Sequence, residues 1–318
     1  MEHSSLKRPL NSKLQFTDLA GIMARVYVRH APWLSGKETI TREYLNAWLR
    51  DHPRKVVARS GFGAQFNTDT RDLIQRYIYI FGLWEPPLTK WLQRTLQPGD
   101  TFVDVGANIG YFSLLASRLV EASGRVVAVE ASPDFHTLLS ANVSLNKATN
   151  VRTVSEAVSD RAEILHFILA SSANMGANSI VPYAGEAESQ IDVPARPLPD
   201  ILSASELAAA RVIKVDVEGA EGAVVRGIVP ALGRLRPDAE LAIEVTPERL
   251  ARLGESAQEL LDALASHGFR PYRLPNDYAP ASYPRAVRRP GPAPLRWEGP
   301  VEGETEFVFS RIDAESLG

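Results

Sequence analysis

The chain has 318 residues, of which 45% are hydrophobic and 23% are charged, and its formal net charge is −3. This composition is typical of a globular protein and excludes general disorder. The balance of 35 basic against 38 acidic residues argues against binding to a nucleic-acid backbone, and the absence of cysteine excludes disulfides, thiolate metal sites and a cysteine nucleophile.

Membrane segments are not expected either. The first ten residues are polar and lack the apolar core of a signal peptide. The longest apolar runs have the length of a strand and not of a bilayer span. We therefore expect a cytoplasmic protein without a membrane partner.

Residues 1–95 are predicted to form an N-terminal helical cap. Apolar residues at helical spacing predict two helices between positions 14 and 50 and another over 69–81. A short hairpin is expected at 56–67. A further helix is expected to start at Pro86 or Pro87, because proline is well tolerated in the first turn of a helix.

Residues 96–318 are predicted to form a second domain in which strands alternate with helices. This alternation indicates an α/β fold, with a mostly parallel twisted sheet and helices on both faces. The expected core strands are 101–105, 125–130, 151–158, 212–217, 241–245 and 270–274.

Three further segments complete this second domain. Segments 163–170 and 190–196 alternate like an inserted hairpin, and 306–310 is expected to be an antiparallel edge strand at the C-terminus. Residues 275–303 are rich in proline, arginine and tyrosine, and we expect them to form a long substrate loop.

A glycine-containing loop follows the first core strand. Gly106 permits a tight turn and close approach of a ligand to the backbone. A dinucleotide fingerprint would need glycine at 106, 108 and 111, but Asn108 and Tyr111 occupy the last two positions. The spacing of Asp104, Gly106 and Gly110 instead resembles the first motif of S-adenosyl-L-methionine-dependent methyltransferases; an ordinary strand-to-helix turn is the alternative.

The next core strand ends in a carboxylate, Glu130. It lies about one strand–helix unit after the glycine loop, where an acid can accept hydrogen bonds from both hydroxyls of a bound ribose. The alternative is that it only favours the positive end of the next helix. We predict the ribose role.

Several motifs, taken in order, resemble the FkbM family of methyltransferases over roughly residues 70–275. The strongest are DVGANIGYFS at 104–113, VEASP at 129–133 and KVDVEGAE at 214–221. Additional matches are GLWEP at 82–86, Gly99-Asp100 and NMGANS at 174–179. The resemblance implies a Rossmann-like methyltransferase sheet, S-adenosyl-L-methionine as methyl donor, and O-methylation of a sugar or polyketide-type natural product.

Cofactor contacts are carried over onto the matching positions. They are Asp104, Gly106, Ala107, Asn108, Glu130, Ala131 and Ser132, together with Glu85 in the entry segment and Glu156 and Ala157 at the end of the third strand. A surface strand end is an equal alternative for Glu156, and Glu85 could simply begin a helix.

Asp216 and Glu244 end two core strands, so both are expected at the ligand edge of the sheet. Asp216 could accept the proton of the acceptor hydroxyl while Glu244 orients the acceptor. The two carboxylates could alternatively hold a magnesium ion (Mg2+), although no clear third protein ligand is present.

Two other classes of protein are compatible with this sheet. One is a nicotinamide-dependent oxidoreductase, which Asn108 and Tyr111 disfavour, and the other is a non-catalytic binding module that retains the fold. The expected partner is a small hydroxyl-bearing acceptor and not a nucleic acid. The sequence does not define the acceptor or the oligomeric state.

Overall fold

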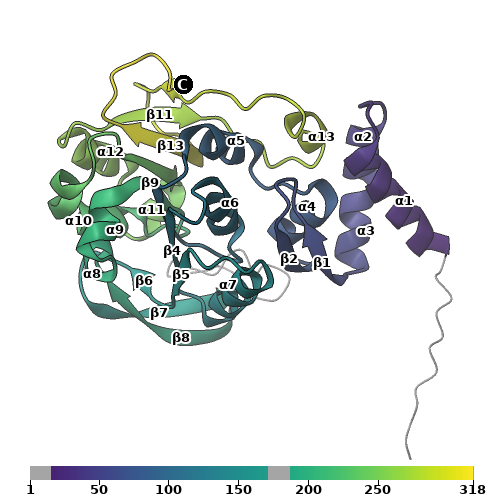
Figure 1. Cartoon of the computed structure of the whole chain (residues 1–318), viewed down its shortest axis with the longest axis horizontal. Coiled ribbons are helices and arrows are strands. Elements are labelled where there is room, and N and C mark those ends of the chain that lie inside the picture. The colour runs from purple at the N-terminus through teal and green to yellow at the C-terminus, as the bar shows by residue number, and fades with distance from the viewer. Residues whose placement is uncertain (1–15, 171–186, 318) are drawn as a thin grey trace, which may run out of the picture.

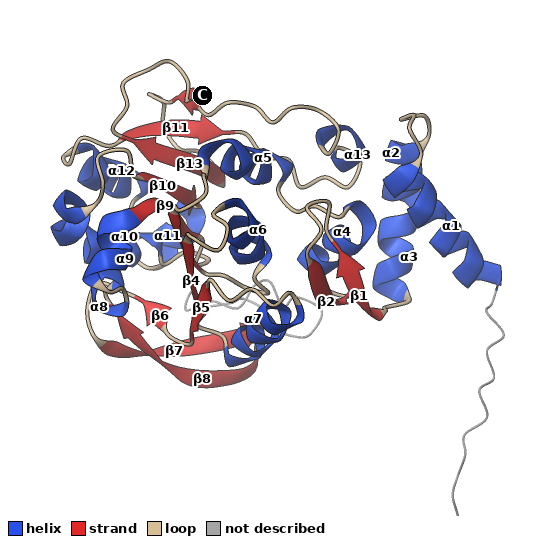
Figure 2. Ribbon diagram, in the orientation of Figure 1, coloured by secondary structure: helices blue, strands red, loops and turns tan. Residues whose placement is uncertain are grey.

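The computed structural model describes residues 16–170 and 187–317, so the motif at 174–179 lies outside the described residues. An eight-stranded sheet has the order β12-β11-β13-β10-β9-β3-β4-β5 (Figures 1 and 2). Strands β10, β9, β3, β4 and β5 are parallel, which confirms the predicted α/β fold. Their bounds are β3 (Thr101–Val105), β4 (Arg125–Val129), β5 (Val151–Val154), β9 (Ala210–Val215) and β10 (Glu240–Val245).

The C-terminal strand β13 (Thr305–Ser310) is antiparallel, as expected, but its predicted edge position is wrong. It lies between β10 and β11 (Arg270–Leu274), and the short β12 (Leu295–Arg296) forms the edge. The reason is visible in its side chains, because Phe307, Val308 and Phe309 are all completely buried. A strand that is apolar on both faces is stable only where neighbouring strands and both helix layers cover it.

Helices cover both faces of the sheet because side chains alternate along each strand. Phe102 and Val126 face a hydrophobic cluster with α5 (Pro86–Thr95) and α6 (Tyr111–Leu119), on the side where α7 (Pro133–Leu145) also packs. Val103 and Val127 face the opposite cluster. The helices of that second face are α8 (Leu198–Ile201), α9 (Ala204–Ala209), α10 (Glu221–Ile228) and α12 (Ala257–Ala265).

The expected third strand is interrupted. Only β5 joins the main sheet, whereas β6 (Ala157–Val158) pairs with β8 (Ala187–Arg196) in a separate sheet of order β6-β8-β7. The hairpin of β7 (Glu163–Ala170) and β8 matches the predicted insertion. The remaining short helices after β9 are η3 (Val229–Arg234), α11 (Pro247–Arg252) and α13 (Tyr283–Ala286).

The N-terminal segment contains the predicted hairpin, β1 (Lys55–Arg59) with β2 (Gln65–Asp69), between helices. These helices are α1 (Phe16–His30), α2 (Lys37–Thr39), η1 (Ile40–Leu45), α3 (Asn46–Asp51) and α4 (Leu73–Phe81). In Figure 1, α1, α2 and α3 lie beyond the hairpin, at the end of the molecule away from α10. The segment is not isolated, because α4 and α5 share one hydrophobic cluster with the first face of the sheet.

The segment 275–303 packs closely against this N-terminal part. Tyr283 is completely buried and lies 4.6 Å from the ring of Tyr77 and 4.9 Å from that of Phe81, measured between centroids. The Arg288 guanidinium donates to the carbonyl oxygens of Ala31 and Pro32 just after α1. The arginine and tyrosine side chains of this segment therefore serve in part as internal anchors.

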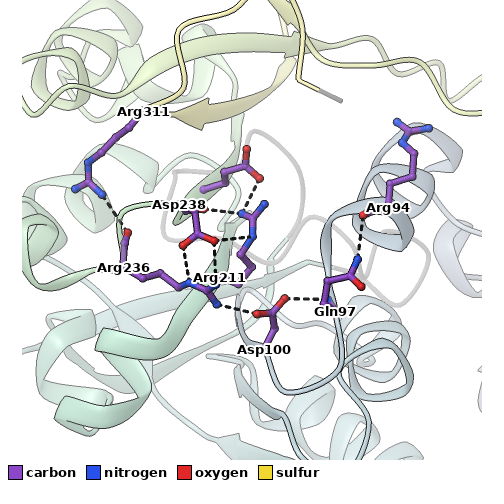
Figure 3. A network of polar contacts seen from close by, with 8 residues as sticks. Arg94, Gln97, Asp100, Arg211, Arg236, Asp238 and Arg311 are labelled. Carbon is purple, nitrogen blue, oxygen red and sulfur yellow. Dashed lines mark hydrogen bonds and ion pairs between the residues drawn. The ribbon is translucent and has the colours of Figure 1, made fainter.

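A polar network joins the amino-terminal ends of the core strands (Figure 3). Arg236 binds Asp100 before β3 at 2.7 Å and Asp238 before β10 at 2.6 Å. Arg211 on β9 binds Glu240 on β10 at 2.8 Å. These contacts stabilise the edge of the sheet opposite the carboxyl ends of the strands. Among the residues that the structure describes, no helix combines the length and apolar character needed to cross a membrane.

Candidate active site

A cavity opens at the carboxyl ends of β3, β4 and β9, where doubly wound sheets bind their ligands. Its empty volume is about 970 Å³, part of which is open to solvent. The predicted site residues that line it are Gly106, Ala107, Asn108, Glu130, Ala131, Glu156, Ala157 and Asp216. The other four, Glu85, Asp104, Ser132 and Glu244, are buried but absent from the lining.

Gly106 is required by a close approach within the protein. Its φ is +79°, and an added Cβ would lie only 1.8 Å from the carbonyl oxygen of Asp216. The amides of Gly106 and Ala107 both donate to the carbonyl oxygen of Val129 at 3.0 Å. The glycine thus lets the ends of β3, β4 and β9 meet directly beneath the cavity.

Glu130 is held by two backbone amides. Its Oε2 accepts from the amide of Asn108 at 2.7 Å, and its Oε1 accepts from the amide of Ser132 at 2.8 Å. Burial raises the pKa of Glu130 to about 7, against the opposing effect of these two hydrogen bonds. Each oxygen keeps a second lone pair, so the oriented carboxyl group can still accept a ligand hydroxyl. Ser132 contributes its backbone and not its side chain to this arrangement.

A buried cation, Lys214, stands between two acids on the first face of the sheet. Lys214 on β9 pairs with Asp104 on β3 in the sheet register, and its Nζ lies 2.9 Å from Oδ2 of Asp216. Burial opposes the charge of Lys214, but the nearby acids outweigh this effect and raise its pKa. Ser113 donates to Oδ2 of Asp104 at 2.5 Å, whereas Oδ1 has no hydrogen-bond partner among the described residues. Asp104 does not line the cavity and therefore acts on the site through Lys214.

Glu85 and Glu244 meet at one tyrosine hydroxyl. The Tyr278 Oη lies 2.9 Å from Oε1 of Glu85 and 3.0 Å from Oε1 of Glu244. Burial raises the pKa of Glu85 to about 7 and that of Glu244 well above its ordinary value, and in both cases the charge of Asp216 adds to the effect. Both acids are buried and absent from the cavity lining, and the charge of Asp216 acts on both.

Part of the cavity wall is apolar. Phe135, Ala157, Val158 and Leu165 line it. Glu156 also lines it and is held by two hydrogen bonds from the guanidinium of Arg196, at 2.7 and 2.8 Å. An apolar wall of this kind can receive a flat ring.

The carboxylates do not form a recognisable metal site. Within residues 16–170 and 187–317, no three His, Asp or Glu side chains are arranged to hold a metal ion. Asp216 is engaged by Lys214, and Glu244 by Tyr278. The residues present therefore do not fit the magnesium alternative.

Sequence reasoning did not assign Lys214, Trp84 or Phe112 to the site, and it included Tyr278 only as part of the expected substrate loop. The first three line the cavity, and Tyr278 stacks on Trp84 with 5.4 Å between ring centroids. A lysine two residues before Asp216 on an otherwise apolar strand was an available signal for Lys214. The contacts of Tyr278 gave no local signal, because its partners are 193 and 34 residues away in the chain.

The fold and cavity define an α/β protein with a preformed pocket at the carboxyl edge of its sheet, with an oriented acid where a ribose can bind. The model of the FkbM methyltransferase domain matches residues 104–271, just over half of the chain. The chain belongs to this family of methyltransferases.

Solved structures of methyltransferases resemble the chain more distantly. Methyltransferase FkbM from Methylobacillus flagellatus has 16% identity and a TM-score of 0.37, covering 74% of this chain and 52% of that one. An S-adenosylmethionine-dependent O-methyltransferase from Thermotoga maritima has 14% identity and a TM-score of 0.39, covering 82% and 78%. Fibrillarin from Aeropyrum pernix, in complex with natively bound S-adenosyl-L-methionine, has 11% identity and a TM-score of 0.38, covering 70% and 73%. No curated protein matches the chain.

Proposed function

We propose that the protein methylates a hydroxyl oxygen of a small acceptor of the sugar or polyketide type, as part of natural-product biosynthesis. The observation that carries this proposal is the position of Asp216, which lines the same cavity as the glycine loop and Glu130. A proton acceptor beside the cofactor pocket suits an acceptor hydroxyl, which is un-ionised at neutral pH.

The cavity fits S-adenosylmethionine in its donor set. The carboxyl group of Glu130, already oriented by two amides, would accept the ribose hydroxyls. Phe135, Ala157 and Val158 would face the adenine, with Glu156 beside it. When bound, the cofactor supplies an activated methyl group.

The chain's own residues would then position the acceptor and receive its proton. Asp216 is restrained by its 2.9 Å ion pair with Lys214, which points one carboxylate oxygen toward the sheet and leaves the other for the acceptor. The aromatic side chains of Trp84 and Phe112 line the same cavity and would exclude water. Such alignment of reacting groups accounts for a large part of enzymatic rate enhancement.

The division into an N-terminal cap and a catalytic domain follows from the same proposal. Residues 1–95 and the loop 275–303 would form the acceptor side, because Trp84 and Tyr278 come from these two segments and stack beside the cavity. The rest of residues 96–318 would hold the cofactor.

Incubation with methyl-labelled donor and a panel of hydroxylated sugars and polyketides tests this proposal. We expect label in an O-methyl ether, with and without a metal chelator. Label on nitrogen or carbon would contradict O-methylation, and loss of activity with chelator, restored by magnesium, would contradict the metal-free reaction.

Parallel calorimetric titrations measure cofactor binding separately from methyl transfer. We expect binding of S-adenosylhomocysteine and none of NAD. Binding of S-adenosylhomocysteine without transfer to any panel member would contradict the proposed acceptor class, and binding of NAD alone would contradict the proposed use of the cavity.

A further inference from the structure

Glu85, Tyr278 and Glu244 form a polar triad, two buried acids joined by a half-buried tyrosine, that the proposed reaction does not yet use. The three side chains come from the turn before α5, from the segment after β11 and from the end of β10. Both acids are more than nine-tenths buried, with exposed fractions of 4% for Glu85 and 8% for Glu244. Because little water reaches these two acids, their contacts with protein groups determine whether each is protonated or ionised.

The two distances from the Tyr278 oxygen indicate how many protons the two carboxyl groups carry together. A tyrosine hydroxyl has one proton and can donate it to only one acceptor. The Tyr278 oxygen nevertheless lies 2.9 Å from an oxygen of Glu85 and 3.0 Å from an oxygen of Glu244. If both acids were ionised, one of these contacts would join two oxygens without a proton between them. A proton on one acid makes both contacts hydrogen bonds.

The charged groups around the triad also favour one proton shared by the two acids. Burial is the largest cause of the raised pKa of both acids, and the charge of Asp216 is the second. Burial also raises the pKa of Tyr278 well above its ordinary value, so the hydroxyl keeps its proton. Two like charges in one buried site disfavour each other. The other charged groups that act on the triad are Lys214, Asp216, Glu218, Arg249, Glu304 and Glu306.

We propose that Glu85 and Glu244 share a single proton through Tyr278, and that Tyr278 is a positioning residue for methyl transfer. The hydroxyl joins the two acids beside Asp216, while the ring of Tyr278 stacks on Trp84, which lines the cavity. Loss of the shared proton would place two repelling carboxylates around the hydroxyl. This repulsion would displace the ring of Tyr278 and, with it, Trp84 in the cavity wall. The proton count stands on the geometry, whereas the effect on methyl transfer rests on the proposed function.

Infrared difference spectra of the full chain test the proton count near neutral pH. Glu85→Gln and Glu244→Gln each supply an amide that donates to Tyr278, so the remaining acid can ionise. We expect each single variant to lose one protonated-carboxyl band and no carboxylate band, and the double variant to lose one of each. Loss of only carboxylate bands, or of two protonated bands in the double variant, would overturn the proposal.

Tyr278→Phe tests the role of the hydroxyl. We expect the protonated-carboxyl band to shift in frequency, because its hydrogen-bond partner is removed. Tyr272→Phe is the control, since Tyr272 is a buried tyrosine whose hydroxyl donates to the carbonyl oxygen of Ile312 and not to a carboxyl group. An unchanged band in Tyr278→Phe would exclude the hydroxyl as the bridge.

The pH profile of methyl transfer to an acceptor from the panel tests the positioning role. We expect the wild-type rate to fall at alkaline pH as the shared proton is lost, and this fall to be absent in Glu85→Gln and Glu244→Gln, whose amides cannot lose it. An alkaline fall that persists in both variants would overturn the positioning role. If no acceptor is methylated, the proposed function fails while the infrared result still decides the proton count.

Discussion

At the scale of single residues, the site depends on groups that are oriented before any ligand arrives. Glu130 is fixed by two amides, and Asp216 by one buried lysine. A group held in place in this way loses little entropy when it binds, which increases its contribution to affinity or rate.

Glu130→Ala is expected to weaken binding of S-adenosylhomocysteine by about 1.5–3 kcal/mol, the range for hydrogen bonds to a charged group. Isothermal titration calorimetry measures the change. Glu163→Ala is the control, because Glu163 is a half-buried carboxylate bonded to Ser159 at 2.7 Å but is absent from the cavity lining. Equal affinities in wild type and Glu130→Ala would remove Glu130 from the ribose site.

Asp216→Asn is expected to lower turnover by about a hundredfold or more, because the amide cannot accept the acceptor's proton. Affinity for S-adenosylhomocysteine should change little, since Glu130 and the glycine loop are intact. Turnover with labelled donor and calorimetry together measure the two effects. Full turnover in the variant would assign Asp216 a structural role only.

At the scale of elements, the carboxyl edge of the sheet brings the site together through alternation along its strands. Lys214, Asp104 and Glu244 share one face, and Glu244 pairs with Glu306 on β13 in the sheet register. Apolar residues occupy the other face, so the chemistry is confined to the side that α5 and α6 cover.

The sequence was sufficient for features with a local signal. Alternating apolar strands and amphipathic helices predicted the parallel sheet, and the glycine loop with Glu130 predicted residues that do line the cavity. The place of β13 inside the sheet could not be derived in this way, since it depends on pairing with a strand about sixty residues earlier. The contacts of Tyr278 with Glu85 and Glu244 are equally non-local.

Gly106→Ala is expected to destabilise the fold by roughly 1–3 kcal/mol, the usual cost of a left-handed conformation for a non-glycine residue, and more if the end of β9 must move. Urea denaturation measures the free energy of unfolding. Gly233→Ala is the matched control, because a Cβ there meets no atom within 4 Å and its φ is not in the left-handed region. We expect that variant to be neutral or slightly more stable. Similar stabilities for both variants would contradict the packing role of Gly106.

At the scale of the whole molecule, distant parts of the chain close the site. Tyr77 on α4 donates to the carbonyl oxygen of Tyr278 at 2.9 Å, and Lys90 on α5 donates to that of Ala286 at 2.6 Å. These bonds fix the segment after β11 to the N-terminal part, which also supplies Trp84. The cap and the sheet thus form one packed unit around a set of buried acids.

These buried acids predict how stability depends on pH. Burial raises the pKa of Glu85, Glu130 and Glu221 to about 7 and that of Glu218 to about 8, from an ordinary value of 4.5. The folded state therefore binds protons more tightly than the unfolded state. Stability from these groups is fully present below about pH 4.5 and is lost as the pH rises through 7 to 8.

Glu221→Gln isolates one member of this set. Its Oε1 accepts from the amide of Gly219 at 2.9 Å, which glutamine can retain, but the amide side chain does not ionise. We expect the wild-type free energy of unfolding in urea to fall between pH 5 and pH 8, and the fall to be smaller in Glu221→Gln by up to about 3 kcal/mol. Glu43→Gln, at an exposed pair with Arg42, should keep the wild-type dependence. Parallel curves for wild type and Glu221→Gln would show that ionisation of this buried acid does not oppose folding.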